Sequence, residues 1–321
     1  MSMAVTEEEV LWCYRALLRR EPETAEIVKL KMSLEKDFRS LLLGFLNSQE
    51  YLREVAAAGF VALDRNAIQV DTTASPLELS LVKDRIRETW SQLGLDRPHD
   101  SILSGADYQP ENIDEESIER FYATGLEEAA IVEAVLGRFG FAQSKSKVCV
   151  EYGCGVGRVT FALAAMFEVV HAYDISANHL RLAQQHATEF GVGNVEFHLC
   201  APDTVSDALV PCDFYYSRLV FQHNPPPLIR ELVSAALNAL RPGGIAIFQV
   251  PTYGLGYSFS SKEYVANPRC REIEMHCFPQ HELFALIASL HCILLEVNQD
   301  TAVGRYGEWI SNTFVVQRPS P

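Results

Sequence analysis

Residues 148–158 read VCVEYGCGVGR: a short apolar run, an acid, and then glycine at every second position. A run of Val and Cys this short favours a buried parallel strand over a helix. Glycine has no Cβ, so it adopts positive φ readily and lets a ligand lie directly on the backbone. The residues after Arg158 have helical periodicity, and the N-terminus of that helix would face the ligand. The stretch predicts a strand, a ligand-binding turn and a helix; the alternative is a tight turn without a ligand.

Strands and helices alternate after this turn. Further strands are predicted at 168–173, 195–199, 212–217 and 245–250, with helices between them from Ser176 to Gly191 and from Leu228 to Leu240. This alternation predicts an α/β fold with a doubly wound, mostly parallel sheet and helices on both faces. Two more strand-like runs, 293–297 and 313–317, are separated only by a tip without helical periodicity. They should pair as a hairpin, so one of them runs antiparallel to the rest.

Several features of this region together resemble the class I methyltransferases that use S-adenosylmethionine. They are Glu151-x-Gly153-x-Gly155-x-Gly157, the acid Asp174 at the end of the second strand, Arg241-Pro242-Gly243-Gly244 before the fifth strand, and the terminal hairpin. The resemblance covers about residues 120–317. It implies a seven-stranded sheet in the order 3-2-1-4-5-7-6 with strand 7 antiparallel, an enzyme that transfers a methyl group, and S-adenosylmethionine as its cofactor.

The main alternative is a dinucleotide-binding oxidoreductase, which also places glycines directly after a strand. That fingerprint requires its third glycine one position later than Gly157, where this chain has Arg158. The terminal hairpin argues against it as well. The sequence therefore favours a nucleoside sulfonium over a dinucleotide as the ligand.

The resemblance also implies which residues bind the cofactor. Asp174 follows Gly153 by 21 residues. It would lie at the tip of the neighbouring strand, where a carboxylate can accept hydrogen bonds from both ribose hydroxyls. The alternative is that Asp174 caps the next helix, a position for which Ser176 competes. Adenine would be bound by Asp203 or by the backbone of Ala201. The full predicted set is Glu151, Gly153, Gly155, Gly157, Asp174, Asp203, Ser217, Tyr122 and Gly125, of which Tyr122 and Gly125 would close over the cofactor.

One histidine is a candidate for catalysis. Methyl transfer from a sulfonium is an in-line displacement, so aligning the acceptor with the methyl group supplies much of the acceleration. A hydroxyl acceptor also benefits from a general base. His223, in the sequence FQHNP, follows the fourth strand at the rim where acceptors bind in open α/β sheets. The alternative is a loop histidine that transfers no proton.

A long loop is predicted at 252–279, where this architecture commonly covers the acceptor. Its Tyr, Arg and Glu side chains suit a hydroxylated or sugar-like acceptor, although they equally suit a solvated loop. The candidates for substrate binding are Tyr253, Tyr257, Tyr264 and His276. The spacing of Cys270, His276, Cys277 and His281 is irregular, so no metal site is predicted.

The N-terminal part of the chain has a different character. Residues 1–60 are helical in pattern and resemble a small helical module attached to bacterial enzymes of polysaccharide and glycan metabolism. Residues 61–123 are interpreted as a linker centred on 71–76, then a helix and a lid segment. A capping box of Thr124 and Glu127 predicts the first helix of the methyltransferase domain, which would cover 124–321.

The bulk composition excludes several classes of partner. The chain has 321 residues and a formal net charge of −15, which disfavours a general attraction to nucleic acid or to an anionic membrane. Its cysteines include no CxxC pair and lie mostly in apolar runs, as reduced cytosolic thiols do. Neither a signal peptide nor a membrane span is predicted. We therefore expect a bacterial cytoplasmic protein with no nucleic-acid partner and no membrane insertion.

These inferences predict methyl transfer to a small-molecule or saccharide acceptor, most simply at a hydroxyl. Two alternatives stay open. One is a non-catalytic, cofactor-binding scaffold of a glycan-assembly complex that docks through residues 1–60. The other is a small-molecule N-methyltransferase, which needs no base if the amine arrives neutral.

Overall fold

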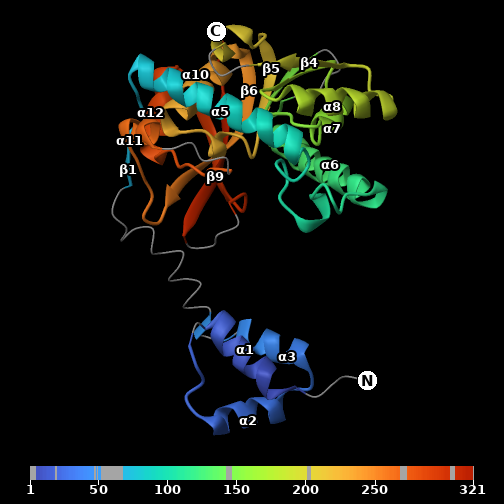
Figure 1. Cartoon of the computed structure of the whole chain (residues 1–321), viewed down its shortest axis with the longest axis vertical. Coiled ribbons are helices and arrows are strands. Elements are labelled where there is room, and N and C mark those ends of the chain that lie inside the picture. The colour runs from blue at the N-terminus through green and yellow to red at the C-terminus, as the bar shows by residue number, and fades with distance from the viewer. Residues whose placement is uncertain are drawn as a thin grey trace. The chain divides into compact units, whose positions relative to one another are not determined.

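The chain forms two compact units, Met1–Ala67 and Ile68–Pro321. The computed structural model, drawn in Figure 1, describes residues 5–18, 20–46, 48, 50–51, 68–141, 147–200, 204–267, 273–303 and 308–320. The described part of the first unit contains helices α1 (Glu7–Leu17), α2 (Ala25–Leu34) and α3 (Phe38–Leu46). They enclose a small apolar core of their own, with Val10, Cys13 and Leu41 fully buried.

The second unit is built on a seven-stranded sheet. The strands lie in the order β4-β3-β2-β5-β6-β9-β8, and β9 runs antiparallel to both of its neighbours. The order and the reversed strand expected from the resemblance are both confirmed. The bounds are β2 Val148–Tyr152, β3 Val169–Asp174, β4 Val195–Leu199, β5 Cys212–Ser217, β6 Leu240–Gly254, β8 Ile293–Asp300 and β9 Trp309–Gln317.

Helices cover both faces of this sheet, as Figure 1 shows. One face packs against α5 (Pro76–Asp96), α10 (Pro226–Ala239) and α12 (Gln280–Ser289), which share a core with inward-facing strand residues such as Val150 and Tyr215. The other face packs against α6 (Glu115–Arg138) and α7 (Thr160–Met166), with Cys149 and Phe214 beneath them. Successive side chains of a strand point to opposite faces of the sheet, so alternate residues of one strand belong to two separate cores.

Several short elements complete the second unit. Helix α8 (Ala177–Glu189) follows β3 and begins at the N-cap Ser176, whose side chain accepts a hydrogen bond from the His179 N–H. The remaining elements are η1 (Ala106–Tyr108), α9 (Val205–Ala208), η2 (Phe221–His223) and α11 (Ser261–Ala266). No helix in the described part of the chain combines the length and the apolar character that a membrane crossing needs.

The predicted start of the helix before β2 is wrong. Helix α6 begins nine residues before Thr124, at Glu115, and its capping box is formed by Asp114 and Ser117. Thr124 lies inside the helix, where its hydroxyl donates to the Phe121 carbonyl at 2.6 Å. A half-buried Thr inside a helix has the same local sequence pattern as a cap, so periodicity and capping rules alone cannot separate the two.

The stretch expected to be the centre of the linker is also docked onto the second unit. Strand β1 (Gln69–Val70) pairs in parallel with β7 (Ser258–Phe259). A carboxylate oxygen of Asp71 accepts from the Ser261 N–H at 2.9 Å, and the guanidinium of Arg230 donates to the carbonyl of Thr72 at 2.9 Å. The boundary between the units therefore falls before Ile68, and residues 52–67 lie outside the described part.

Candidate active site

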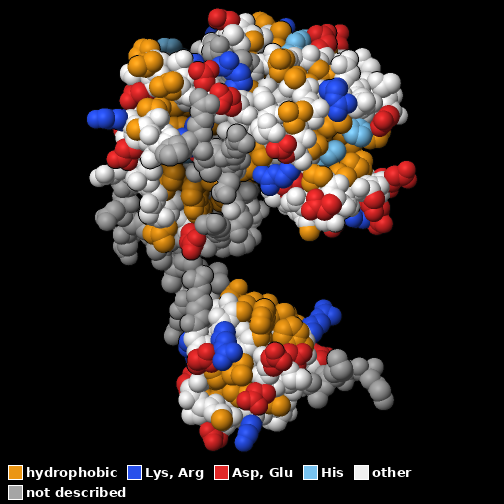
Figure 2. All heavy atoms as spheres, viewed as in Figure 1, with side chains coloured by type: hydrophobic (Ala, Val, Ile, Leu, Met, Phe, Trp, Pro, Cys, Tyr) orange, Lys and Arg blue, Asp and Glu red, His pale blue; other side chains and the backbone are white. Residues whose placement is uncertain are grey.

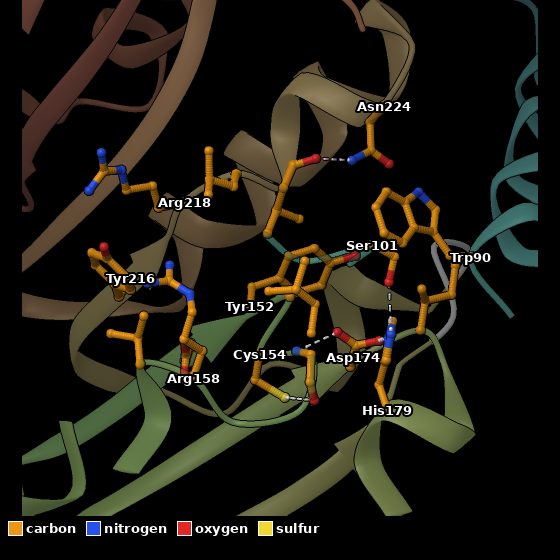
Figure 3. Close-up of a pocket in the computed structure, with 18 of the residues that line it drawn as sticks. Trp90, Ser101, Tyr152, Cys154, Arg158, Asp174, His179, Tyr216, Arg218 and Asn224 are labelled. Carbon is orange, nitrogen blue, oxygen red and sulfur yellow. Dashed lines mark hydrogen bonds and ion pairs between the residues drawn. The ribbon is translucent and has the colours of Figure 1, made fainter. Parts of the chain in front are cut away.

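A cavity opens at the carboxyl ends of β2, β3 and β5, where ligands bind in open α/β sheets. Its walls come from the glycine turn, from α5 and α6, and from the segments after β3 and β5. Figure 3 shows its two ends. Arg158, Tyr216 and Arg218 lie at one end, and Asp174, His179, Ser101 and Trp90 lie at the other. The cavity is thus long, and its polar groups differ from end to end.

The glycine turn has the geometry that its sequence predicts. Gly153 has φ 78° and Gly155 has φ 55°, both in the left-handed region that side chains disfavour. A Cβ on Gly155 would stand 2.3 Å from the Cδ1 of Ile102, and one on Gly153 would stand 2.2 Å from a methyl of Val220. Both glycines line the cavity, and a methyl group at either position would collide with the side chain packed against it.

Asp174 is held rigidly at the end of β3. Its Oδ2 accepts from the Gly155 N–H at 2.8 Å, and its Oδ1 accepts from the Ser176 N–H at 2.8 Å. Ser176, and not Asp174, is the helix cap. Each carboxylate oxygen can accept two hydrogen bonds, so one position on each stays open toward the cavity for a diol.

A second carboxylate, Glu151, lies at the end of β2 inside the cavity wall. It is 4% exposed, and its Oε2 has no hydrogen-bond partner among the described residues. Burial raises the pKa of this carboxyl from 4.5 to about 8, and Thr160 and Arg158 oppose the shift only in part. An orphaned buried acceptor of this kind fits a ligand that brings a positive charge or an N–H donor.

An ionic cluster closes the same end of the cavity. The carboxylate of Glu128 accepts from Arg158 at 2.7 Å and from the Tyr216 hydroxyl, and lies 3.5 Å from the guanidinium of Arg218. The two arginines face a single buried carboxylate here, because Glu151 is held in its neutral form up to about pH 8. This end therefore has positive charge available for an anionic group on a ligand.

A short segment before η1 covers the turn. Ile102 packs on Gly155, and the Ser101 hydroxyl forms a hydrogen bond with His179 Nε2 at 3.2 Å. The other ring nitrogen of His179 lies 3.6 Å from Asp174. Ser101 and Ile102 of this segment line the cavity, whereas Tyr122 and Gly125 do not; the lid role stays a prediction.

Several predicted cofactor residues support the wall from behind. The Tyr122 hydroxyl donates to the Val156 carbonyl at 3.0 Å, and Ser217 donates to the Tyr152 carbonyl at 2.9 Å. A Cβ on Gly125 would stand 1.8 Å from the Arg158 carbonyl oxygen, so α6 touches the glycine turn there. Gly157 (φ 90°) lets the ring of Phe161 approach. Asp203 and Ala201 lie outside the described residues.

His223 is buried in a polar network beside the cavity. Its Nδ1 donates to the Glu274 carbonyl at 2.8 Å, and its Nε2 accepts from the Gln222 amide at 3.0 Å. Burial lowers the pKa of its imidazole to about 4. Arg218, Leu219, Val220 and Asn224 of this loop line the cavity, whereas His223 does not. A base role for His223 stays a prediction, and it would require Nε2 to give up its bond to Gln222.

The predicted acceptor loop is held by a second polar cluster. Glu274 accepts from the Tyr264 hydroxyl at 2.6 Å and pairs with Arg85 of α5. The Tyr257 hydroxyl donates to the Nδ1 of His276 at 2.9 Å, and the Nε2 of His276 lies 3.4 Å from the Glu274 carboxylate. Three of the four predicted acceptor residues thus converge, whereas Tyr253 pairs with Ile310 between β6 and β9.

Sequence reasoning missed several residues that line the cavity. Glu128 and Trp90 come from helices distant in sequence, and no local signal marks them. Arg218 and Leu219 directly follow β5, so their position at the carboxyl end of a strand could have suggested them. Leu219 has φ 59°, and its N–H donates to Gln249 at 3.1 Å, a strained conformation of the kind that is often found at functional sites.

Comparison with known proteins agrees with this geometry. Residues 149–244 match the family of the methyltransferase domain. The chain carries a class I S-adenosylmethionine-dependent methyltransferase domain. The magnesium protoporphyrin IX methyltransferase of Synechocystis PCC 6803 has the same fold. With S-adenosylhomocysteine bound, its structure matches at a TM-score of 0.53 and 18% identity, over 74% of this chain and 99% of that one. With S-adenosylmethionine bound, the TM-score is 0.51, at 18% identity over 74% of this chain and 97% of that one.

A sequence relative of this methyltransferase domain covers a shorter region. It is the ubiquinone biosynthesis O-methyltransferase of Idiomarina loihiensis, which is 28% identical over 117 residues. The match spans 35% of this chain and 47% of that relative, so it covers about half of the relative's length.

The cofactor of this methyltransferase domain is S-adenosylmethionine, and the cavity fits it. Gly153 and Gly155 both line the cavity, so their backbone faces the bound ligand. Asp174 at one end suits a ribose diol, while the orphaned Oε2 of Glu151 suits the ammonium group of the methionine tail. The two arginines near Glu128 suit the carboxylate of that tail.

Proposed function

We propose that this enzyme methylates a hydroxyl group on a small-molecule or saccharide acceptor. The observation that carries the proposal is the cavity with Asp174 at one end and Glu151 at the other, bridged by glycines. The sequence relative from Idiomarina loihiensis is an O-methyltransferase, which supports oxygen as the acceptor atom. The hydroxyl-rich cluster around Glu274 supports a polar acceptor. A place in the bacterial cytoplasm stays a prediction from the sequence.

In the proposed reaction the residues of this chain bind the cofactor, orient it and exclude water. When bound, S-adenosylmethionine supplies an electrophilic methyl group on a sulfonium. Asp174 would hold its ribose, and Glu151 with Arg158 would hold its methionine tail. The apolar side chains of Ile102 and Val220 lie over the turn and limit the entry of water. Positioning of this kind supplies most of what an in-line displacement needs.

The loop after β5 and the loop at 254–267 with 273–279 would bind the acceptor. Trp90 and Asn224 line the cavity on that side, and the ring of Trp90 lies 5.3 Å from that of His223. The buried amides of Gln222 and Gln249 connect His223 to β6, with 3.0 Å between the two amide groups. In the proposed reaction this network fixes the acceptor loop in place.

Two measurements test the proposal. Calorimetry with S-adenosylhomocysteine should give one saturable site. If the protein is normally folded but does not bind S-adenosylhomocysteine, the proposal is contradicted. Methyl-labelled S-adenosylmethionine is then incubated with small-molecule extracts of the native host, and the product is tested for an ether, an ester or an amine. An N-methyl product would favour the N-methyltransferase, and an ester would contradict a hydroxyl acceptor.

A scaffold role is the second candidate, and the surface of the first unit favours it. Large apolar side chains are about half exposed or more there, namely Trp12, Leu30, Leu34 and Leu43. Figure 2 shows apolar side chains grouped on this unit. Such a surface suits docking to a protein partner. Cofactor binding without any labelled product from host extracts would support the scaffold and contradict the enzyme.

A further inference from the structure

Three potential metal ligands meet on one face of the sheet, at the edge formed by β3 and β4. His171 lies on β3 directly opposite Glu196 of β4 in the strand register. His198 lies two residues after Glu196, so its side chain points to the same face. Among the residues that the structure describes, this is the one group of three His, Cys, Asp or Glu side chains close enough to share an ion.

The distances within this group match a metal site. The His171 Nδ1 is 3.0 Å from the His198 Nε2 and 3.3 Å from the Glu196 Oε2, and the last two atoms are 3.9 Å apart. Zinc bound tetrahedrally to imidazole and carboxylate has bonds of about 2.0–2.1 Å, which separates its ligand atoms by roughly 3.3 Å. The same three atoms therefore form a triangle of nearly the size of one face of a zinc tetrahedron.

We propose that His171, Glu196 and His198 bind one divalent transition-metal ion of the zinc type, with water as the fourth ligand. Two imidazoles and one carboxylate bind ions of this type in preference to magnesium or calcium, which favour oxygen ligands. A hydrogen bond between two neutral histidines is the ordinary alternative. It explains the 3.0 Å contact but not the carboxylate placed across from both rings.

The neighbouring residues hold the two rings in place. The ring of His198 stacks on Tyr173 at 4.6 Å between centroids, and the Tyr173 hydroxyl donates to the Ala208 carbonyl at 3.0 Å. The side chain of His171 is 14% exposed and that of Glu196 is 61% exposed. The imidazoles are thus preorganised from the protein side, while the carboxylate can close over the ion from the solvent side.

The position of the site gives it a structural role. His171 precedes Asp174 by three residues on the same strand, a separation of about 10 Å. An ion there does not touch the reacting atoms. It joins the edge strand β4 to β3, and because it binds only the folded arrangement, it stabilises the fold by mass action.

The test uses the untagged full-length chain, freed of metal with a chelator and then titrated with zinc chloride by calorimetry. One equivalent should bind, and the melting temperature should rise with the zinc concentration. His171→Gln and His198→Gln should each weaken binding by at least about tenfold. The Glu196→Gln variant should lose less, because its neutral amide oxygen still coordinates. X-ray absorption of the zinc complex should show two imidazole ligands.

The control is His281→Gln, because His281 also lies near a carboxylate, 3.8 Å from Glu282, but has no third donor. Its zinc affinity should equal that of the parent protein. Circular dichroism and binding of S-adenosylhomocysteine confirm that each variant is folded. Absence of saturable binding at one equivalent, or affinity that is unchanged in both histidine variants, would overturn the proposal. Zinc binding is measured without the methyl-transfer reaction. A negative result in the zinc titration therefore contradicts the metal site and leaves the methyltransferase proposal intact.

Discussion

Glu151 is the residue whose environment differs most from what its sequence context suggests. The acid before a glycine turn could have been an ordinary ionised ligand, yet burial raises its pKa to about 8. In the free protein it is therefore mostly protonated at neutral pH. A ligand that brings an ammonium group favours the charged form, so binding must release a proton below about pH 8.

This coupling predicts the pH dependence of cofactor affinity. Binding of S-adenosylhomocysteine should strengthen as the pH rises from about 6 toward 8, by up to about tenfold per pH unit. Calorimetry in buffers with different ionisation enthalpies measures the proton released. In Glu151→Gln the proton release and most of the slope should vanish. An unchanged slope in this variant would show that another group carries the charge.

Asp174 gives a second prediction at this scale. Asp174→Asn removes the charge that the ribose hydroxyls would bind and places an amide N–H against a backbone N–H. A hydrogen bond to a charged group contributes about 1.5–3 kcal/mol, so affinity for S-adenosylhomocysteine should fall by roughly tenfold to a hundredfold. Ser176→Ala is the control: it removes a helix cap and some stability but should leave the affinity close to that of the parent.

His223 illustrates how far sequence reasoning about a single residue reaches. Its place after β5 could be predicted, because the motif and the strand order fix it. Its surroundings could not, since the Glu274 carbonyl that accepts from it is 51 residues away in the chain. The same limit applies to Arg218 and Glu128, whose meeting depends on how α6 packs on the sheet.

Among the elements, the strands were predicted better than the helix before them. Alternating apolar runs and glycine stops placed β2 to β6 and the terminal hairpin, because buried parallel strands have a strong local signature. Helix α6 was shortened in the prediction because an internal Thr resembled a cap. The β1–β7 pairing had no signal, since two residues are too few for periodicity.

Helix α6 offers a matched pair of substitutions. Gly125→Ala would drive a methyl group into the Arg158 carbonyl, whereas nothing lies within 4 Å of a Cβ on Gly137. We expect Gly125→Ala to lower the free energy of unfolding by about 1–3 kcal/mol and to weaken cofactor binding, because the glycine turn must move. Gly137→Ala should raise stability by up to about 1 kcal/mol. Urea unfolding measures the free energy of unfolding of both variants. Equal changes in the two variants would contradict the close packing at Gly125.

At the scale of the whole molecule, buried histidines and a buried carboxyl have opposite effects on how stability depends on pH. Burial lowers the pKa of His99 and of His223 from 6.5 to about 4, so the unfolded chain binds more protons than the folded one in that range. Stability therefore rises with pH from about 4 to 6.5. Glu151 acts in the opposite sense from 4.5 to 8, because its folded pKa is raised.

The sum of these groups predicts a maximum of stability near pH 6.5. Between 4.5 and 6.5 the histidines His99 and His223, joined by His198, whose pKa burial also lowers, outweigh one carboxylate. Above 6.5 the raised pKa of Glu151 dominates, so stability declines toward pH 8. Denaturant unfolding between pH 4 and 9 measures the curve. Glu151→Gln should remove the alkaline decline, while His223→Asn should flatten the acid limb. A decline that persists in Glu151→Gln would reject this assignment.

The short ladder between β1 and β7 has a mechanical consequence. The chain enters the second unit at Ile68 and is fastened at once to Ser258 and Phe259, while Asp71 holds the first turn of α11. A pulling force on the N-terminal side of Ile68 is thus applied to the acceptor loop before it reaches the main sheet. Such a load is carried first by Ser258 and Phe259, the two residues of β7.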